Sequence, residues 1–180
     1  YARARLLESG YKEIGIDHFS KPEDALYQAF EEGRMHRNFM GYSDSKTEVM
    51  IGLGASSISD SWDAFAQNEK SIEAYYALLD ENKIPVVKGH ILDDEDLEVR
   101  KHILNLMCHY LTKWDEHSIL DWDLITSKLS ELESDGLVQL SEQQIDIPKQ
   151  GHAFIRNICM CLDMRLYRKA PNTQVFSQTI

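Results

Sequence analysis

The stretch "DDEDLEVRKHILNLMCHYL", residues 93–111, marks the point at which the sequence pattern changes. It opens with acidic residues, which are favoured at a helix N-terminus because the helix dipole is positive there. We therefore predict a helix that begins near Asp93 and continues through the apolar residues that follow. This helix opens the second of two predicted domains, residues 1–90 and residues 91–180.

The second part of the sequence is predicted to be mostly helical. A second helix, "WDLITSKLSELESDG" (122–136), is closed by Gly136, because glycine commonly ends helices. Residues 137–151 are predicted to form a strand, a polar turn and a strand. Residues 152–169 are predicted to form one final helix. The order helix, helix, hairpin, helix resembles a winged-helix unit.

The first part of the sequence alternates between helix and strand. Residues 2–10 read as a helix stopped by Gly10, residues 11–19 as a strand, and residues 20–33 as a helix with Pro22 in its first turn. This rhythm predicts an α/β layer with parallel strands, and an α+β fold overall. The remaining elements are a loop over 34–47, strands over 48–59, 63–70 and 85–92, and a helix over 71–83.

Composition and charge narrow the class of protein. The 180 residues are 43% hydrophobic and 27% charged, as in ordinary globular domains. The net charge of −11 argues against nucleic acid as a partner, because duplex binding depends on neutralising phosphates. The sequence holds no run of about 18 apolar residues, so we expect no membrane span. It begins "YARARLLESG", without an initiator methionine or signal segment, which we interpret as a piece of a longer, cytoplasmic protein.

Cysteine and histidine spacing does not predict a metal site. Cys159 and Cys161 are two residues apart, so on one helix they point about 200° away from each other. Cys108 belongs to a different element. His102 and His109 share a helix face, but a metal site would need further ligands. We expect buried thiols and two polar residues at a domain seam.

Two other short stretches leave alternatives open. Asp17 and His18 follow a predicted parallel strand, where α/β sites gather, and the alternative is local hydrogen bonding. The small residues of "GLGASSIS" (52–59) either admit a flat ligand close to the backbone or serve tight strand packing.

A basic tail follows the acidic part of the chain. Arg165, Arg168 and Lys169 share one helix face. Three roles are open for them. They complement the dipole at a helix C-terminus, bind the carboxylates of an anionic ligand, or dock onto the acidic surface of the same chain.

Six stretches together resemble one family in order and in register. They are "GIDHFSKP" (15–22), "HRNFMGY" (36–42), "IGLGASSIS" (51–59), "FAQN" (65–68), "RNICMCLD" (156–163) and "FSQTI" (176–180). The family is oxygen-independent coproporphyrinogen III oxidase, a radical S-adenosylmethionine enzyme of haem biosynthesis. The resemblance implies the last strands and helices of a partial (β/α) barrel, followed by a mostly helical C-terminal domain.

The resemblance also implies a reaction. The family converts two propionates of coproporphyrinogen III to vinyl groups, which releases carbon dioxide and gives protoporphyrinogen IX. A 4Fe–4S cluster and S-adenosylmethionine supply the radical, and an unidentified acceptor takes the electron. The family's C-x-x-x-C-x-x-C loop is missing here, so we expect no catalytic residue in this chain and no activity from it alone.

Some binding residues follow from the resemblance. Phe39, Met40 and Ile58 match positions that contact a second S-adenosylmethionine, and relatives usually carry glutamine in place of Met40. Because coproporphyrinogen carries four carboxylates, Arg156, Arg165 and Arg168 form a hypothetical propionate-binding face.

Two alternatives remain beside this interpretation. One is the haem-chaperone branch of the same radical family, and the other is a non-catalytic protein-interaction module. The motifs "RNICMCLD" and "FSQTI" favour the oxidase.

Overall fold

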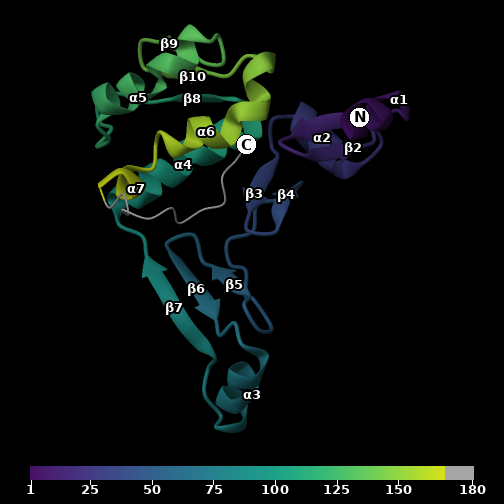
Figure 1. Cartoon of the computed structure of the whole chain (residues 1–180), viewed down its shortest axis with the longest axis vertical. Coiled ribbons are helices and arrows are strands. Elements are labelled where there is room, and N and C mark those ends of the chain that lie inside the picture. Colours follow the sequence, from purple (N-terminus) through teal and green to yellow (C-terminus); the bar gives the residue numbers. More distant parts are fainter. Residues whose placement is uncertain (169–180) are drawn as a thin grey trace.

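The computed structural model describes residues 1–168 and mixes helices with short strands. Figure 1 shows a helical body around α4 (Asp94–His109), two small hairpins beside it, and an arm that extends away from it. The predicted α+β character is confirmed, but every strand pair within residues 1–168 is antiparallel. The predicted parallel layer is therefore wrong.

The N-terminal segment shows why that prediction failed. It contains α1 (Ala2–Glu8), β1 (Lys12–Gly15), β2 (His18–Ser20) and α2 (Ala25–Glu31). The single strand predicted over 11–19 reverses near Ile16, whose φ is +33°, and β2 pairs antiparallel with β1. The run of apolar residues continues through this reversal, so the pattern does not show the turn.

The predicted loop over 34–47 contains a second hairpin, formed by β3 (His36–Asn38) and β4 (Gly41–Ser43). A small buried cluster lies beside these hairpins and consists of Ile14, Ala29, Met35 and Cys108. Cys108 belongs to α4, so this cluster attaches the N-terminal segment to the helical body.

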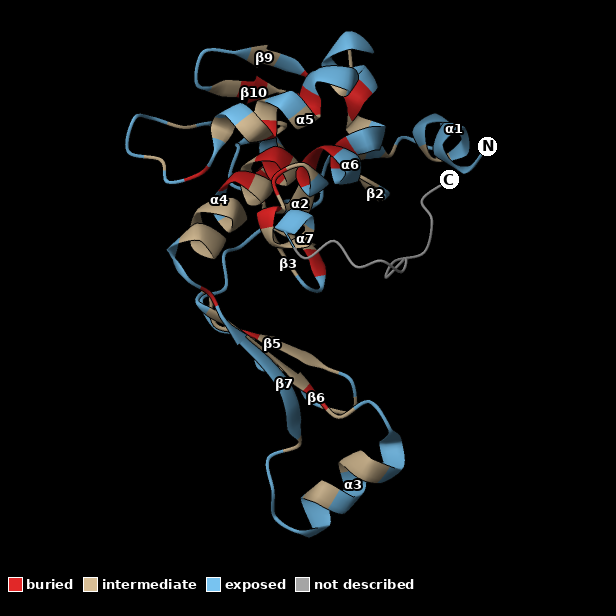
Figure 2. Cartoon of the chain, turned by 60° about the vertical axis from the view of Figure 1, so that its left-hand side comes forward, coloured by how far each residue is buried: buried red, intermediate tan, exposed pale blue. Residues whose placement is uncertain are grey.

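The arm consists of β5 (Ile58–Asp60), β6 (Ala64–Asn68), α3 (Ile72–Asp80) and β7 (Val86–Ile91). The strands form one antiparallel sheet in the order β5-β6-β7, and β7 is exposed along its length (Figure 2). The predicted elements over 63–70, 71–83 and 85–92 are confirmed.

The strand predicted over 48–59 is present only at its end. Asn68, the last residue of β6, donates hydrogen bonds from its Nδ2 to the loop before β5. The acceptors are the carbonyl oxygens of Gly52 and Gly54, at 3.2 and 3.0 Å. A Cβ at Gly52 would lie 2.7 Å from the Ile58 carbonyl oxygen. The small residues of this stretch therefore serve tight local packing.

The helix predicted from Asp93 is α4, and it begins at a capping box. The Asp93 carboxylate accepts a hydrogen bond from the Asp96 backbone N–H at 2.9 Å, and the Asp96 carboxylate accepts one from the Asp93 N–H at 3.2 Å. Such reciprocal bonds satisfy backbone donors that the first helical turn leaves free. No helix within residues 1–168 has the length and apolar character of a bilayer span.

The remaining body contains β8 (Leu111–Lys113), α5 (Trp122–Ser134), β9 (Gln139–Ser141) and β10 (Gln144–Asp146). The predicted hairpin is confirmed as β9 and β10, and β8 joins it in the order β8-β10-β9. The likeness to a winged-helix unit and the domain boundary near residue 90 remain predictions.

The single final helix predicted over 152–169 is wrong. The chain forms a 3₁₀ helix, η1 (Lys149–Phe154), then α6 (Ile155–Met160) and α7 (Met164–Arg168). Asp163 separates α6 from α7, because its carboxylate accepts a hydrogen bond from the Leu166 N–H at 2.8 Å and so caps a new helix. Lys169 and the motif "FSQTI" lie outside the described residues.

The main core lies around α4 (Figure 2). Leu106 packs into a cluster with Ile125, Ile145 and Ile158, while Cys108 packs into the smaller cluster at the hairpins. Residues two apart on a helix point in nearly opposite directions, so α4 separates the two clusters and contributes to both.

A buried polar pair lies next to the main core. His102 is fully buried, and its Nδ1 lies 2.7 Å from Thr112 Oγ1. The rings of His102 and Trp122 meet edge to face. Burial lowers the pKa of His102 from its ordinary value of 6.5.

We expect His102 to make stability depend on pH. The unfolded chain binds a proton at this residue below about pH 6.5, whereas the folded chain resists it, so stability falls as the pH drops from about 7 to 5. Urea unfolding should show a smaller loss over this range for His102→Asn. Other histidines are unchanged in the variant, so equal pH dependence of the two proteins would contradict the prediction.

Gly151 is required by close packing. An added Cβ would lie 2.0 Å from the Leu137 carbonyl oxygen, so we expect Gly151→Ala to destabilise the fold by about 3 kcal/mol. Gly10→Ala is the control, because no atom lies within 4 Å and only its φ of +85° is unfavourable, at about 1 kcal/mol. Chemical denaturation compares the two variants, and equal losses would contradict the packing argument.

Candidate functional site

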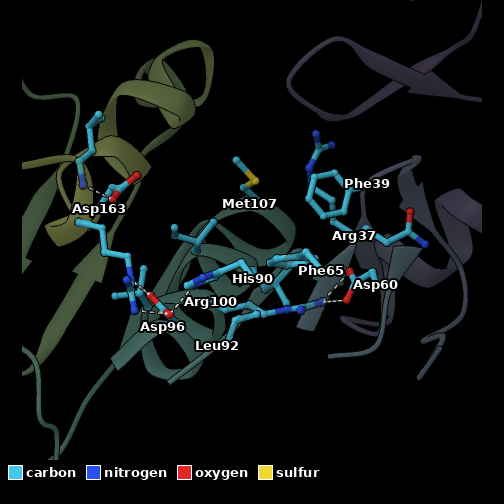
Figure 3. Close-up of a pocket in the computed structure, with 16 residues that line it drawn as sticks. Arg37, Phe39, Asp60, Phe65, His90, Leu92, Asp96, Arg100, Met107 and Asp163 are labelled. Carbon is cyan, nitrogen blue, oxygen red and sulfur yellow. Dashed lines mark hydrogen bonds and ion pairs between the residues drawn. The ribbon is translucent and has the colours of Figure 1, made fainter. Parts of the chain in front are cut away.

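A pocket of about 700 Å³ lies where the β3–β4 hairpin, the arm, α4 and α7 meet (Figure 3). Its walls are largely apolar. The rings of Phe39 and Phe65 meet edge to face, with their centroids 5.0 Å apart. The other apolar lining residues are Leu92, Val99, Ile103, Leu104, Met107 and Leu166.

One ion pair joins the arm to α4 at this pocket. Arg100 Nη2 donates to both carboxylate oxygens of Asp60, at 2.9 and 2.8 Å, and Nη1 donates to the Trp62 carbonyl oxygen at 2.7 Å. The side chains of Arg100 and Asp60 are only 13% and 7% exposed. The Arg100 guanidinium also lies 4.5 Å from the centroid of the Trp62 ring. Figure 3 shows this pair on the Phe39 side of the pocket.

A second charged cluster lies on the opposite side, around Asp96 (Figure 3). Asp96 Oδ2 lies 2.8 Å from His90 Nε2 and accepts a hydrogen bond from Arg165 Nη2 at 2.8 Å. Arg165 also pairs with Asp93, at 2.5 Å. Partial burial would raise the pKa of Asp96, but hydrogen bonds from Arg165 and His90 outweigh it and hold this pKa below its ordinary value.

Arg37 is the third arginine that lines the pocket. Its guanidinium lies over the Tyr42 ring, 4.8 Å from the centroid. Its Nη1 is buried and has no hydrogen-bond partner among the described residues.

The residues predicted to contact S-adenosylmethionine are not all in this pocket. Phe39 lines it and is 53% exposed. Met40 is 84% exposed and does not line the pocket, and Ile58 is half-buried in β5, opposite Gln67 in the ladder. The structure therefore brings only Phe39 of the three to the pocket.

Of the three predicted substrate arginines, one lines the pocket. Arg165 lines the pocket, Arg168 pairs with Glu95 at 2.6 Å, and Arg156 is exposed on α6 away from the pocket lining. Arg165 and Arg168 both bind acidic residues at the start of α4. Of the alternatives for the basic tail, the described part shows docking onto the acidic surface of the same chain.

The cysteines occupy separate surroundings. Cys108 lies in the small cluster and Cys159 in the main core, where burial raises their pKa values to about 11 and about 12. Cys161 follows the end of α6, and its Sγ lies 3.5 Å from the Asn157 carbonyl oxygen. Within residues 1–168, no three His, Cys, Asp or Glu side chains are placed to hold a metal ion. The described residues therefore do not fit an iron–sulfur cluster.

The other histidines mentioned above make local contacts. His18 Nδ1 lies 2.9 Å from Asp17 Oδ1; Asp17 is on the turn between β1 and β2 and His18 begins β2, so neither follows a parallel strand. The site role that we considered for Asp17 and His18 depended on the parallel strand, so this argument for it is wrong. His102 is buried and His109 is exposed, so they do not share one environment.

Sequence reasoning missed Asp60, His90 and Arg100. A signal for Arg100 was present, because it lies three residues before Ile103 and four before Leu104 on the same helix, so it shares their apolar face. An arginine in such a position needs a partner, but the partner comes from another element 40 residues away.

We expect the Asp60–Arg100 pair to be required for stability. Asp60→Ala leaves a largely buried guanidinium without its carboxylate, so the loss should be about 3–5 kcal/mol in denaturant unfolding. Replacing both partners with apolar residues, Asp60→Leu with Arg100→Met, should recover part of it. Glu32→Gln removes an exposed partner of Arg34 and should cost less than about 1 kcal/mol. If Asp60→Ala lowered the free energy of unfolding by no more than Glu32→Gln does, the prediction would be contradicted.

Comparison with known proteins places these features in a family. No family model matches the chain. Oxygen-independent coproporphyrinogen III oxidase from Escherichia coli is 38% identical over 98% of the chain, and the enzyme of the same name from Synechocystis is 37% identical over 98%. The chain spans 40% of the length of each of these relatives.

A solved structure agrees with the sequence comparison. Coproporphyrinogen III oxidase from Escherichia coli, described as a radical SAM enzyme, matches 92% of this chain and 40% of its own, with a TM-score of 0.84 and 36% identity. By sequence and by fold, the chain belongs to the oxygen-independent coproporphyrinogen III oxidase family.

Proposed function

We propose that this chain is the C-terminal part of an enzyme that converts two propionates of coproporphyrinogen III to vinyl groups. The product is protoporphyrinogen IX, so the enzyme belongs to haem biosynthesis. The observation that carries the proposal is the similarity to named oxidases along 98% of the chain. We expect this chain to be inactive alone, because the cluster-binding cysteine loop of the family is missing from it.

The pocket supports the proposal through its chemistry. A porphyrinogen is a large, mostly apolar macrocycle with carboxylates at its edge, and such a ligand needs apolar walls with a few cationic groups. Phe39, Phe65 and Met107 supply the walls, while Arg37 and Arg165 lie at the margins. These residues would bind the macrocycle, orient it and exclude water from one side.

We propose S-adenosylmethionine and a 4Fe–4S cluster as the cofactors of the whole enzyme. When bound, they supply the radical that removes a hydrogen atom from the propionate. The cluster is assigned to the part of the enzyme outside this chain. Phe39, Met40 and Ile58 are the proposed contacts to a second S-adenosylmethionine, and Phe39 is the one that also lines the pocket.

The arginine assignments also remain proposals. Arg165 is supported by its place at the pocket, although Asp93 and Asp96 already hold it. Arg168 and Arg156 do not line the pocket, so its geometry gives them no support. The electron acceptor is unidentified, and we propose a cytoplasmic enzyme without a nucleic-acid partner or membrane span.

The alternatives are less well supported. The relatives reported above carry the oxidase name, which does not favour a haem chaperone or a non-catalytic interaction module.

The test uses the full-length gene product that contains this chain. Its cluster is reconstituted anaerobically, and it receives coproporphyrinogen III, reductant, S-adenosylmethionine and a cell extract as electron acceptor. We expect protoporphyrinogen together with deoxyadenosine. Arg165→Ala should raise the half-saturating substrate concentration about tenfold or more, because a charge-assisted bond contributes about 1.5–3 kcal/mol. Haem binding without decarboxylation would contradict the proposal and favour the chaperone.

A further inference from the structure

The pocket arginines differ in how their charges are balanced. Arg100 binds Asp60, and Arg165 binds Asp93 and Asp96. Arg37, from β3, has no carboxylate within ion-pair distance among residues 1–168. Of these three arginines, it is the one available to bind an added anion.

The surroundings of Arg37 make this lack of a partner costly. Its Nη1 is shielded from water and donates to no acceptor in the described part of the chain. A buried charged donor without an acceptor is unfavourable, because it has lost hydration and gained nothing in return. The Tyr42 ring under the guanidinium stabilises the cation but accepts no conventional hydrogen bond from it.

The position of Arg37 indicates what kind of anion would fit. Figure 3 shows Arg37 beside Phe39 at one edge of the pocket, with Met107 across from them. Phe39 is half-exposed, so an aromatic face is available next to the guanidinium. An anion at Arg37 would therefore belong to a ligand whose larger part carries apolar or aromatic rings that cover this wall. Arginine suits a carboxylate, because its planar fork matches the two oxygens.

We propose that Arg37 binds a carboxylate of the ligand that fills this pocket, and that the rest of this ligand carries apolar or aromatic rings. The inference rests on the proposed function, in which two molecules have this chemistry. One is the porphyrinogen with its propionates, and the other is S-adenosylmethionine with its amino-acid carboxylate and adenine ring. Arg100 then holds the pocket in shape, and Arg165, at the other margin, remains the proposed partner of a second carboxylate.

The test titrates the 180-residue chain with two probes. Coproporphyrin III, the oxidised and fluorescent form of the substrate, reports binding by fluorescence, and S-adenosylmethionine is followed by calorimetry. The variants are Arg37→Gln, Arg37→Lys and the control Arg5→Gln, which makes the same change on α1, far from the pocket lining. Circular dichroism establishes that the variants are folded. The tetramethyl ester of coproporphyrin is the matched ligand without carboxylates.

We expect Arg37→Gln to weaken one of the two probes about tenfold or more, with Arg37→Lys intermediate, because a point charge keeps attraction but loses the fork. Arg5→Gln should bind as the unchanged chain does. Loss confined to coproporphyrin identifies a propionate, provided that the ester binds equally to all variants, and loss confined to S-adenosylmethionine identifies the cofactor carboxylate.

Two results would overturn the inference. One is equal binding of both probes by Arg37→Gln and the unchanged chain, and the other is no binding of either probe. Neither result bears on the proposed function, because formation of protoporphyrinogen by the full-length gene product is measured separately.

Discussion

The position of α4 is the constraint on which the rest of the structure depends. Leu106 points into the main core and Cys108 into the small cluster at the hairpins. Arg100, on the same helix and nearer its start, binds Asp60 of the arm. One rigid helix therefore attaches the N-terminal segment, the arm and the C-terminal body, and the pocket lies where these parts meet (Figure 1).

Charge and apolar surface have separate roles in this pocket. The macrocycle or ring system of a ligand would contact the apolar walls, which supply most of the area. The pairs Arg100–Asp60 and Arg165–Asp96 join the arm and α7 to α4, so they fix the distance between the walls. These carboxylates already neutralise Arg100 and Arg165, whereas Arg37 has a buried Nη1 without a hydrogen-bond partner among the described residues.

Short helices at the end of the described chain show how one side chain redirects the backbone. Asp163 caps α7, which brings Arg165 and Arg168 against the acidic start of α4. The acidic residues that begin α4 thus have two roles. They interact favourably with the positive end of the helix dipole, and they form ion pairs with the arginines of α7. Arg165 and Arg168 thereby hold α7 against the start of α4.

The family, the start of α4 and the hairpin of β9 and β10 could be predicted from the amino-acid sequence, because these depend on local signals such as acidic caps, turn residues and motifs in order. Only the tertiary structure decided that the 11–19 segment reverses and that the final helix breaks at Asp163. It also decided that Arg37, among the arginines that line the pocket, has no carboxylate partner within residues 1–168. The physical reason is that ion pairing depends on distance in space: Asp60 reaches Arg100 across 40 residues, and no local pattern records such a contact.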